Sequence, residues 1–469
     1  MFRYFRLNAP FRLVGLLALL LLTQLPFFLD AYPFTVTELR YMLIGGKMAE
    51  GATMYRDLYD GMGPLSAGVY GILDSLFGRS VTAYRVLAIA LVFTQCCIFA
   101  ISGVLNKAYK ENNYASGLVM MTLFCSFFQY MSLTPMLMAN TFLILATHFS
   151  MNHVMSRQGE DSQILTVGIM AGLASLFYWP ALLFLAGLEI VMVFLTNSVF
   201  RRYVLLIAGA ALPLGFCAVY YLWHDGLHNL LNQGILSILH NRTAPLVNHT
   251  SVWAVCAIPL LLFFRALPAL WGGRGFNYRH MSYGYAMLIT AATALAVYFI
   301  SPYRSPSNLI FVIGPAAFFI THYLLEIRKR FVTEIVFGFF IVLILGFNYT
   351  VALTPNIWAE YVDLSQLTIP KPTGLENGEA EKTLVLGPNF RLYGNGELAT
   401  PFLDWRFTKP IFEELDDYGN LLLIHQAFEN DPPKKIIDQE NVMPKLLEKI
   451  PEFQQRYRKA GEGTYILIL

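Results

Sequence analysis

The stretch that decides the fold of this chain runs from Thr37 to Arg85 and reads TELRYMLIGGKMAEGATMYRDLYDGMGPLSAGVYGILDSLFGRSVTAYR. It follows the first long apolar run and contains several acidic residues, a Tyr-Arg-Asp run at 55–57 and a Gly-Pro step at 63–64. The rest of the chain is mostly apolar. Polar residues concentrated at this point are therefore expected to face water at a membrane surface.

Two short helices are predicted within this stretch. Residues 37–50 show helical periodicity, with Thr37 placed to cap the helix and Gly51 placed to end it. Residues 64–77 begin with a proline and stop at Gly78. Because a membrane-spanning helix needs roughly 20 apolar residues, both helices are predicted to lie on the outer membrane surface.

The composition indicates a polytopic membrane protein. The 469 residues are 56% hydrophobic and 14% charged, with a mean hydropathy of +0.51, which is outside the range of soluble globular proteins. A net charge of +2 creates no field that would attract nucleic acid. The five cysteines lie in apolar runs without metal-ligand spacing, so they are interpreted as small core residues.

Eleven apolar runs are long enough to be candidate membrane spans. They lie near 13–29, 82–105, 114–131, 136–154, 163–179, 181–197, 203–223, 252–271, 282–300, 308–325 and 333–353. Arg and Lys gather in alternate loops, beginning with the N-terminal segment, and basic loops stay on the cytoplasmic side. The N-terminus is therefore predicted inside, and everything after about residue 354 outside.

The last part of the chain changes in composition and predicts a small α/β domain. Strands are predicted at 383–387, 434–438 and 464–469, and helices at 409–418 and 442–458. The predicted organisation is a transmembrane domain over 1–353 with the outer helices at 37–50 and 64–77, a linker over 354–382, and an extracytoplasmic α/β domain over 383–469.

The opening stretch carries a series of motifs in a fixed order. They are Glu38, Tyr41, Gly51, Tyr55-Arg56-Asp57, Asp60, Gly63-Pro64-Leu65, Phe77-Gly78 and Ala83-Tyr84-Arg85-Val86-Leu87. This order resembles the first external loop of the GT-C superfamily, the polytopic glycosyltransferases that include protein mannosyltransferases and lipid A aminoarabinose transferases. One position departs from the family pattern. The usual Asp-Glu pair, whose Asp is the candidate catalytic carboxylate, is replaced by Thr37 and Glu38.

The resemblance implies a GT-C-like fold of about eleven transmembrane helices and a glycosyltransferase activity. The enzyme would move a sugar from a polyprenyl-phosphate donor to a glycan, lipid or protein acceptor at the outer face of the cytoplasmic membrane. It implies no cofactor and no metal, and membrane lipid as a partner rather than nucleic acid. The departure at Thr37 keeps an alternative open, a catalytically inactive scaffold or accessory subunit of an envelope assembly. A transporter is disfavoured because the sequence shows no inverted repeat.

The transfer needs a carboxylate that takes the proton from the acceptor hydroxyl, and threonine cannot be that base near neutral pH. The candidates are Glu38 first, Asp57 second and Asp30 third, with Asp60 also near. Each has a structural interpretation as well. Glu38 would favour a helix N-terminus, Asp57 and Asp60 would pair with Arg56 or cap a helix, and Asp30 would mark the membrane boundary.

The leaving phosphate needs cationic side chains, and the forked guanidinium of Arg suits it. The candidates are Arg304 with its neighbour Tyr303, then Arg85, Arg56 and Arg40. The competing interpretation makes Arg304 and Tyr303 an anchor at the membrane interface.

Two further features carry ionisable groups. The pair His224 and His228 has the i, i+4 spacing of metal ligands, but no carboxylate at helical spacing completes a site, so no metal is predicted. Glu189 lies inside a predicted span, where an ionisable residue is a functional candidate by default. Its competing interpretation is pairing within the protein.

Overall fold

The computed structural model describes residues 1–7, 9–28, 32–156, 160–196, 199–240, 244–268, 278–358, 360–370, 381–394 and 396–468. The chain forms two compact units, each assembled from three segments. The first unit comprises Met1–Pro33, Tyr84–Cys217 and Arg242–Gln366. The second comprises Phe34–Ala83, Ala218–Asn241 and Leu367–Leu469.

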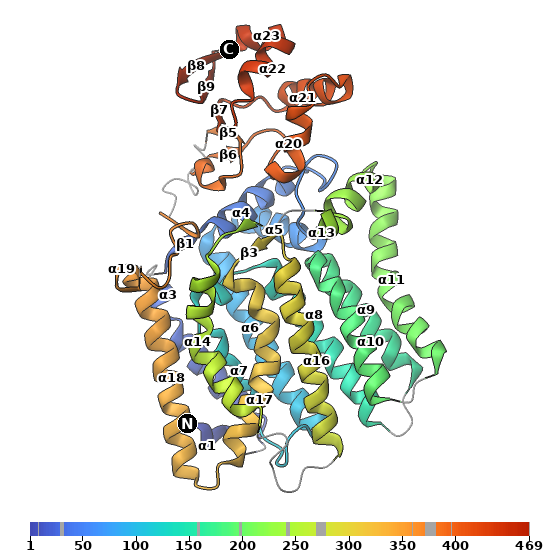
Figure 1. Cartoon of the computed structure of the whole chain (residues 1–469), viewed down its shortest axis with the longest axis vertical. Helices are drawn as coiled ribbons and strands as arrows, with labels where there is room; N and C mark the ends of the chain where they lie inside the picture. The colour runs from blue at the N-terminus through green and yellow to red at the C-terminus, as the bar shows by residue number, and fades with distance from the viewer. Residues whose placement is uncertain are drawn as a thin grey trace. The chain divides into compact units, whose positions relative to one another are not determined.

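The first unit is a bundle of helices (Figure 1). Its main helices are α2 (Arg12–Thr23), α6 (Val81–Leu105), α7 (Ala115–Phe124), α8 (Pro135–Met155), α9 (Asp161–Phe177), α10 (Leu183–Leu195), α11 (Phe200–Trp223), α14 (His249–Ala266), α16 (Tyr278–Ile300), α17 (Ile313–Glu326) and α18 (Arg330–Leu353). Each of the eleven predicted apolar runs thus forms a helix. In the described part of the chain, six helical segments are long and apolar enough to cross a membrane: α6, α11, α14, α16, α18 and the segment Pro306–Glu326. The total of eleven spans stays a prediction.

Short elements join these helices. They are α1 (Phe2–Phe5), α3 (Leu25–Phe28), α19 (Pro355–Trp358), the 3-10 turns η1 (Phe128–Met131), η2 (Trp179–Leu182) and η4 (Pro306–Val312), and strands β2 (Ala244–Pro245) and β3 (Tyr303–Arg304). Strands β2 and β3 pair in parallel.

Small residues let the helices of the bundle approach closely. A Cβ atom added at Gly168 or Gly172 of α9 would collide with the backbone of α11 near Leu206 and Ala210. A Cβ atom at Gly187 of α10 would collide in the same way with a side chain of α16. Close packing at small residues is the usual basis of helix association in membranes, where lipid removes the hydrophobic drive.

The second unit contains the two helices predicted in the opening stretch, α4 (Val36–Ala49) and α5 (Pro64–Phe77). Strand β1 (Phe34–Thr35) precedes α4 and pairs antiparallel with β4 (Thr368–Ile369). The middle segment of the unit continues α11 into the short turns α12 (Leu227–Asn229), η3 (Leu230–Ile235, a π-helix) and α13 (Ser237–His240). Whether α4 and α5 lie on a membrane surface stays a prediction.

The last segment of the second unit forms a five-stranded sheet with helices, in the order β6-β5-β7-β9-β8. The strands are β5 (Lys382–Leu386), β6 (Glu397–Leu398), β7 (Lys435–Asp438), β8 (Tyr457–Gly461) and β9 (Thr464–Leu467). The helical elements are η5 (Phe390–Tyr393), α20 (Trp405–Glu413), α21 (Tyr418–Asn430), α22 (Met443–Lys449) and α23 (Pro451–Arg456). Strands β5, β6 and β7 are parallel, and β9 is antiparallel to β7 and β8. A small α/β fold is therefore present, as predicted.

Three local predictions were wrong. The cap of α4 is Thr35, not Thr37, because Thr35 has the extended backbone of an N-cap and Thr37 is already inside the first turn. The predicted helix 409–418 ends at Glu413, and α21, which the sequence analysis missed, begins after Asp417, whose side chain accepts a hydrogen bond from the Gly419 amide. The predicted helix 442–458 runs two residues too far, because Tyr457 and Arg458 begin strand β8, which pairs with β9. The domain boundaries at 353 and 382 stay predictions, and residues 371–380 of the predicted linker lie outside the described residues.

Candidate functional site

The loop that carries the Tyr-Arg-Asp run is tightly folded. Tyr55 is fully buried and has a left-handed backbone with φ 67°. Its hydroxyl donates to the carbonyl oxygen of Met62, and its own carbonyl accepts from the Asn229 side chain at 2.8 Å. A non-glycine residue with positive φ persists only where surrounding contacts hold it. The Tyr-Arg-Asp run is therefore held in a defined conformation by its contacts.

Asp57 and Arg56 are the more exposed residues of this run. The Asp57 carboxylate accepts hydrogen bonds from the Thr53 amide at 2.8 Å and from Arg56 Nε at 2.9 Å. The Arg56 side chain is half exposed. Asp57 thus has a structural role in the loop, while the exposed Arg56 guanidinium stays accessible to an anion.

A largely buried ionic cluster in the second unit comprises Arg40, Asp60, Asp404 and Arg406. Arg40 donates to Asp60 Oδ2 through Nε at 2.9 Å and through Nη2 at 2.6 Å. The same Nη2 donates to Asp404 Oδ2 at 3.0 Å. Arg406 binds Asp404 in a fork, at 3.0 and 2.6 Å. The side chains of both carboxylates are fully buried.

The charges of this cluster balance, two carboxylates against two guanidinium groups. Burial raises the pKa of Asp60, and the nearby Asp404 carboxylate raises it further, while Arg40 and the Met62 amide oppose the shift. A buried carboxylate without partners would be very costly. The four side chains therefore depend on one another, and removing any one leaves a buried charge uncompensated.

The cluster joins the loop to the last segment of the chain. The Tyr59 amide donates to the Pro401 carbonyl at 2.9 Å, and the Asp404 amide donates to the Tyr59 carbonyl at 3.1 Å. The rings of Tyr59 and Phe402 stack with centroids 5.9 Å apart. Sequence reasoning missed Asp404 and Arg406, because Asp404 shows only the local signal of a helix N-cap for α20.

Glu38, the first-ranked base, lies in a capping box at the start of α4. Its carboxylate accepts from the Thr35 amide at 3.0 Å and from the Thr35 hydroxyl at 2.9 Å, and the side chain is almost fully buried. The Thr35 hydroxyl also lies 3.0 Å from that of Thr37. Glu38 therefore stabilises a helix terminus, and its role as a base stays a prediction.

The other predicted residues belong to the first unit. Arg304, on β3 beside Tyr303, donates through Nη2 to the Phe299 carbonyl at 2.7 Å and lies over the Phe299 ring, 5.9 Å from its centroid. Arg85 is buried in the first part of α6. Asp30 lies outside the described residues. Among the candidates, Arg40 and Asp60 are brought into direct contact, and the convergence of Arg304 with the carboxylates stays a prediction.

A second ionic group of the second unit is centred on Asp431. Its carboxylate accepts from Lys47 of α4 at 2.7 Å, from Lys382 at 2.5 Å and from the Thr400 amide at 3.2 Å. Partial burial raises the pKa of Asp431, but the two lysines outweigh it, so the pKa lies below its usual value. Because a lowered pKa belongs to a carboxylate that stabilises the folded state when charged, this contribution exists near neutral pH and is lost in acid.

Asp431→Asn is expected to lower the free energy of unfolding at pH 7 by about 1–2 kcal/mol, discounted for partial exposure. The difference from wild type should shrink as the pH falls below about 4, where the wild-type carboxylate also becomes protonated. Thermal unfolding of both proteins in detergent at pH 7, 5 and 3 measures this. An equal difference at all three pH values would contradict the assignment.

One group of described residues has the side chains to hold a metal ion: His425 and Glu429 on α21, and Glu452 on α23. Arg456 donates to both glutamates, and His425 Nε2 lies 3.2 Å from Glu452. Because the Arg456 guanidinium already pairs with both carboxylates, the group is better explained as an ion-pair network at the surface.

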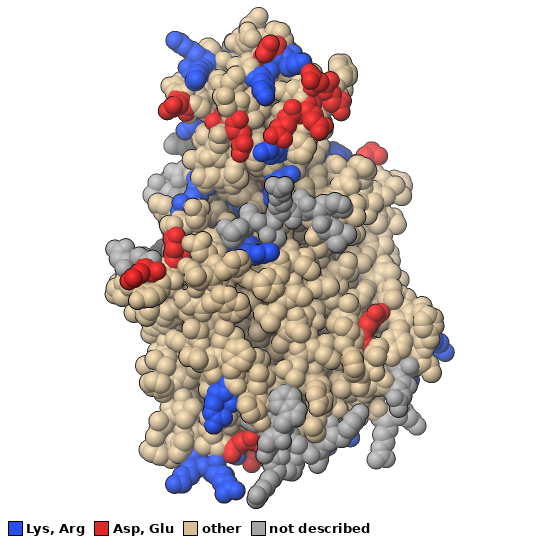
Figure 2. Space-filling view, viewed as in Figure 1, with Lys and Arg blue, Asp and Glu red and all other residues tan. Residues whose placement is uncertain are grey.

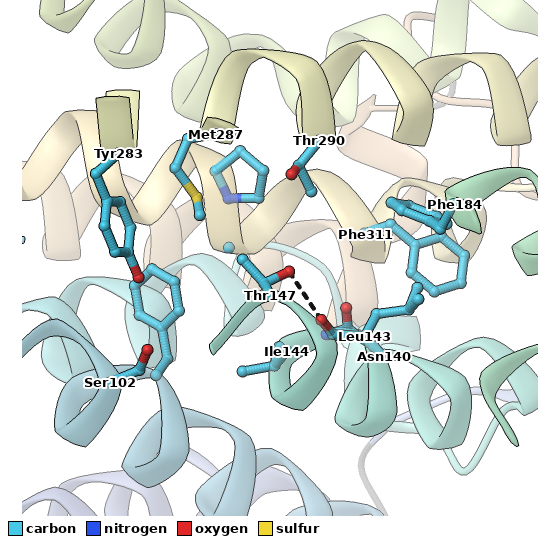
Figure 3. Close-up of a pocket in the computed structure, with 13 residues that line it drawn as sticks. Ser102, Asn140, Leu143, Ile144, Thr147, Phe184, Tyr283, Met287, Thr290 and Phe311 are labelled. Atoms are coloured by element: carbon cyan, nitrogen blue, oxygen red, sulfur yellow. Dashed lines mark hydrogen bonds between the residues drawn. The ribbon is translucent and has the colours of Figure 1, made fainter. Parts of the chain in front are cut away.

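A cavity lies within the first unit, between α6, α8, α10, α16, η4 and α17 (Figure 3). Aromatic side chains such as Phe184 and Phe311 line it. Its threonines turn their hydroxyls to their own helices, Thr147 to the Leu143 carbonyl and Thr290 to the Ala286 carbonyl, each at 2.8 Å. Its lining, all in the described part of the chain, includes no Arg or Lys. The cavity therefore suits an apolar group rather than a phosphate.

Comparison with known proteins identifies the fold. No protein-family model matches the sequence, and no curated protein matches it. Among solved structures, the chain is similar to ArnT from Cupriavidus metallidurans bound to undecaprenyl phosphate, with a TM-score of 0.59 and 11% identity over 98% of each chain. The apo state of the same ArnT gives a TM-score of 0.56 and 11% identity over 97% of this chain and 98% of that one. The predicted fold class is confirmed: this is a polytopic helical protein with a fold similar to that of ArnT and a small C-terminal α/β region.

Proposed function

We propose that this chain is a membrane glycosyltransferase that moves a sugar from a polyprenyl-phosphate carrier to a glycan, lipid or protein acceptor. The observation that carries the proposal is the end-to-end fold similarity, 98% of both chains, to a structure that holds undecaprenyl phosphate. The motifs of the opening stretch support it, because Tyr55, Arg56 and Asp57 form an ordered loop. The neighbouring Tyr59 joins this loop to the last segment of the chain through backbone hydrogen bonds.

The chemistry requires one base and one anion site. A carboxylate, Glu38 or Asp57 in our ranking, takes the proton from the acceptor hydroxyl. The acceptor oxygen then bonds to the anomeric carbon, and the bond to the carrier phosphate oxygen breaks with its electron pair. Arg304, Arg85 and the exposed Arg56 are the proposed partners of the departing phosphate. No cofactor takes part.

The proposed location follows from the charge pattern of the loops. We place the protein in the cytoplasmic membrane with its N-terminus inside and residues 354–469 outside, so that the transfer takes place at the outer face. If the second unit lay on the cytoplasmic side, its candidate bases could not reach an acceptor in the cell envelope.

The alternative is an inactive protein of the same fold that acts as a scaffold in an envelope assembly. Two observations favour it: Thr37 stands where the family has an Asp, and Glu38 is engaged in the capping box of α4. The transfer assay below separates the two proposals.

Purified protein supplied with radiolabelled polyprenyl-phosphate sugars and envelope acceptors is expected to transfer label. Arg304→Ala should reduce transfer at low donor concentration by at least tenfold. Arg304→Lys should recover only part of the activity, because an ammonium lacks the fork that binds two phosphate oxygens.

Arg201→Ala is the matched control, since Arg201 is an exposed arginine that pairs with Asp161 on α9. It should transfer at the wild-type rate. If the wild-type protein transfers no sugar from any donor, the scaffold proposal replaces the enzyme. If it does transfer and Arg304→Ala is as active as wild type, the function stands and the assignment of Arg304 is wrong.

A further inference from the structure

Helix α10 carries one ionisable residue in an otherwise apolar sequence, LFLAGLEIVMVFL. Glu189 is at the middle of this helix. At 1.5 Å per residue it lies about 9 Å from either end. In a bundle that spans a membrane, this depth is within the hydrocarbon region, where Asp and Glu are rare and costly.

The Glu189 side chain is only half-buried, and no hydrogen bond or ion pair to its carboxylate is found among the residues that the structure describes. Asp161, the first residue of α9, shows the contrast, because its carboxylate forms ion pairs with Arg201 and Arg202 of α11. The interpretation of Glu189 as part of an internal pair therefore has no support in the described chain. The described residues therefore leave room for a partner on another molecule.

The surface around Glu189 faces away from the bundle. Ile190, Val193 and Phe194 are exposed by 44%, 57% and 76%, and Glu189 lies at the edge of the stripe they form, one turn from Val193. The opposite side of α10 packs on α16 through Gly187. Figure 2 shows a broad uncharged surface over α9 and α10 with a small acidic patch within it.

We propose that this face of α10 binds a transmembrane helix of another protein that carries a Lys or Arg at the same depth. Hydrocarbon offers no hydrogen-bond donor, so lipid cannot compensate the carboxylate. A second copy related by a two-fold axis would place Glu189 against Glu189, and like charges in a dry contact repel. A Lys or Arg on the partner helix compensates the negative charge of Glu189 and makes the contact specific. The inference requires the membrane fold and does not depend on the proposed activity.

The test uses the full-length protein in its native membranes, with a photo-crosslinking amino acid at Val193. Wild type is expected to give one discrete protein adduct whose crosslinked peptide, read by mass spectrometry, contains a transmembrane Lys or Arg. Glu189→Lys should reduce this adduct at least tenfold, and exchange of the partner's basic residue for Glu should restore it. Glu189→Gln should keep part of it, because an amide still accepts a hydrogen bond.

A crosslinker at Val204, an equally exposed position on α11, is the matched control and should not give this adduct. Thermal unfolding of each variant in detergent confirms that it folds. Adducts with lipid alone, an adduct with a second copy of this chain, or an adduct unchanged by Glu189→Lys would each overturn the proposal.

Discussion

Arg40→Ala should lower the free energy of unfolding of the second unit by about 3–5 kcal/mol, which is the usual cost of leaving buried carboxylates without their partner. Arg40 pairs with both Asp60 and Asp404, and Asp404 also pairs with Arg406. Because a whole domain is stable by only about 5–15 kcal/mol, the variant should lose much of its folded population. Thermal unfolding and limited proteolysis of the purified full-length protein measure the effect.

The exposed Arg456 provides the control for this prediction. It also pairs with two carboxylates, Glu429 and Glu452, but at the surface. Arg456→Ala should therefore change stability little. The double variant Arg40→Gln with Asp60→Asn should recover part of the loss, because it removes a buried charge together with its partner. If Arg40→Ala is as stable as Arg456→Ala, the buried cluster does not hold the second unit together.

Glu38→Gln is expected to slow sugar transfer by roughly 10²–10⁴, the usual cost of losing a general base. The substitution separates catalysis from stability, because glutamine also completes a capping box. Helix α4 should therefore form as in wild type. The measurement is the initial rate of transfer at saturating donor, together with the unfolding temperature of the same sample.

Thr35→Ala is the matched control, since it removes the other half of the capping box and leaves the carboxylate in place. It should cost about 0.5–2 kcal/mol of stability and leave the rate per folded molecule unchanged. If Glu38→Gln retains the full rate while Asp57→Asn loses it, Asp57 is the base. If both retain it, neither carboxylate is the base and Asp30 becomes the first candidate.

Most helices, and three strands of the five-stranded sheet, could be predicted because their signals are local. The eleven apolar runs all became helices, and α5 occupies the predicted residues 64–77. Proline at the first turn and glycine after the last act within a few residues, so they can be recognised without knowing the fold. One error came where a neighbouring strand decides, at the start of β8, which pairs with β9. The other two, the cap of α4 and the missed α21, concerned the choice among local capping residues.

The sequence by itself determined that this is a polytopic membrane protein, where the helices of the bundle lie, and that the chain ends in a small α/β fold. It also singled out the stretch from Thr37 to Arg85 as the one that carries the polar motifs. Composition and periodicity act locally along the chain, and they carry this information. Only the tertiary structure revealed that Arg40 is bound by Asp60 and by Asp404, which is 364 positions away. It also revealed that Glu38 caps α4 with Thr35 and that Glu189 has no partner among the described residues. Such contacts depend on the path of the whole chain, and a buried charge is stable only where that path brings it a partner.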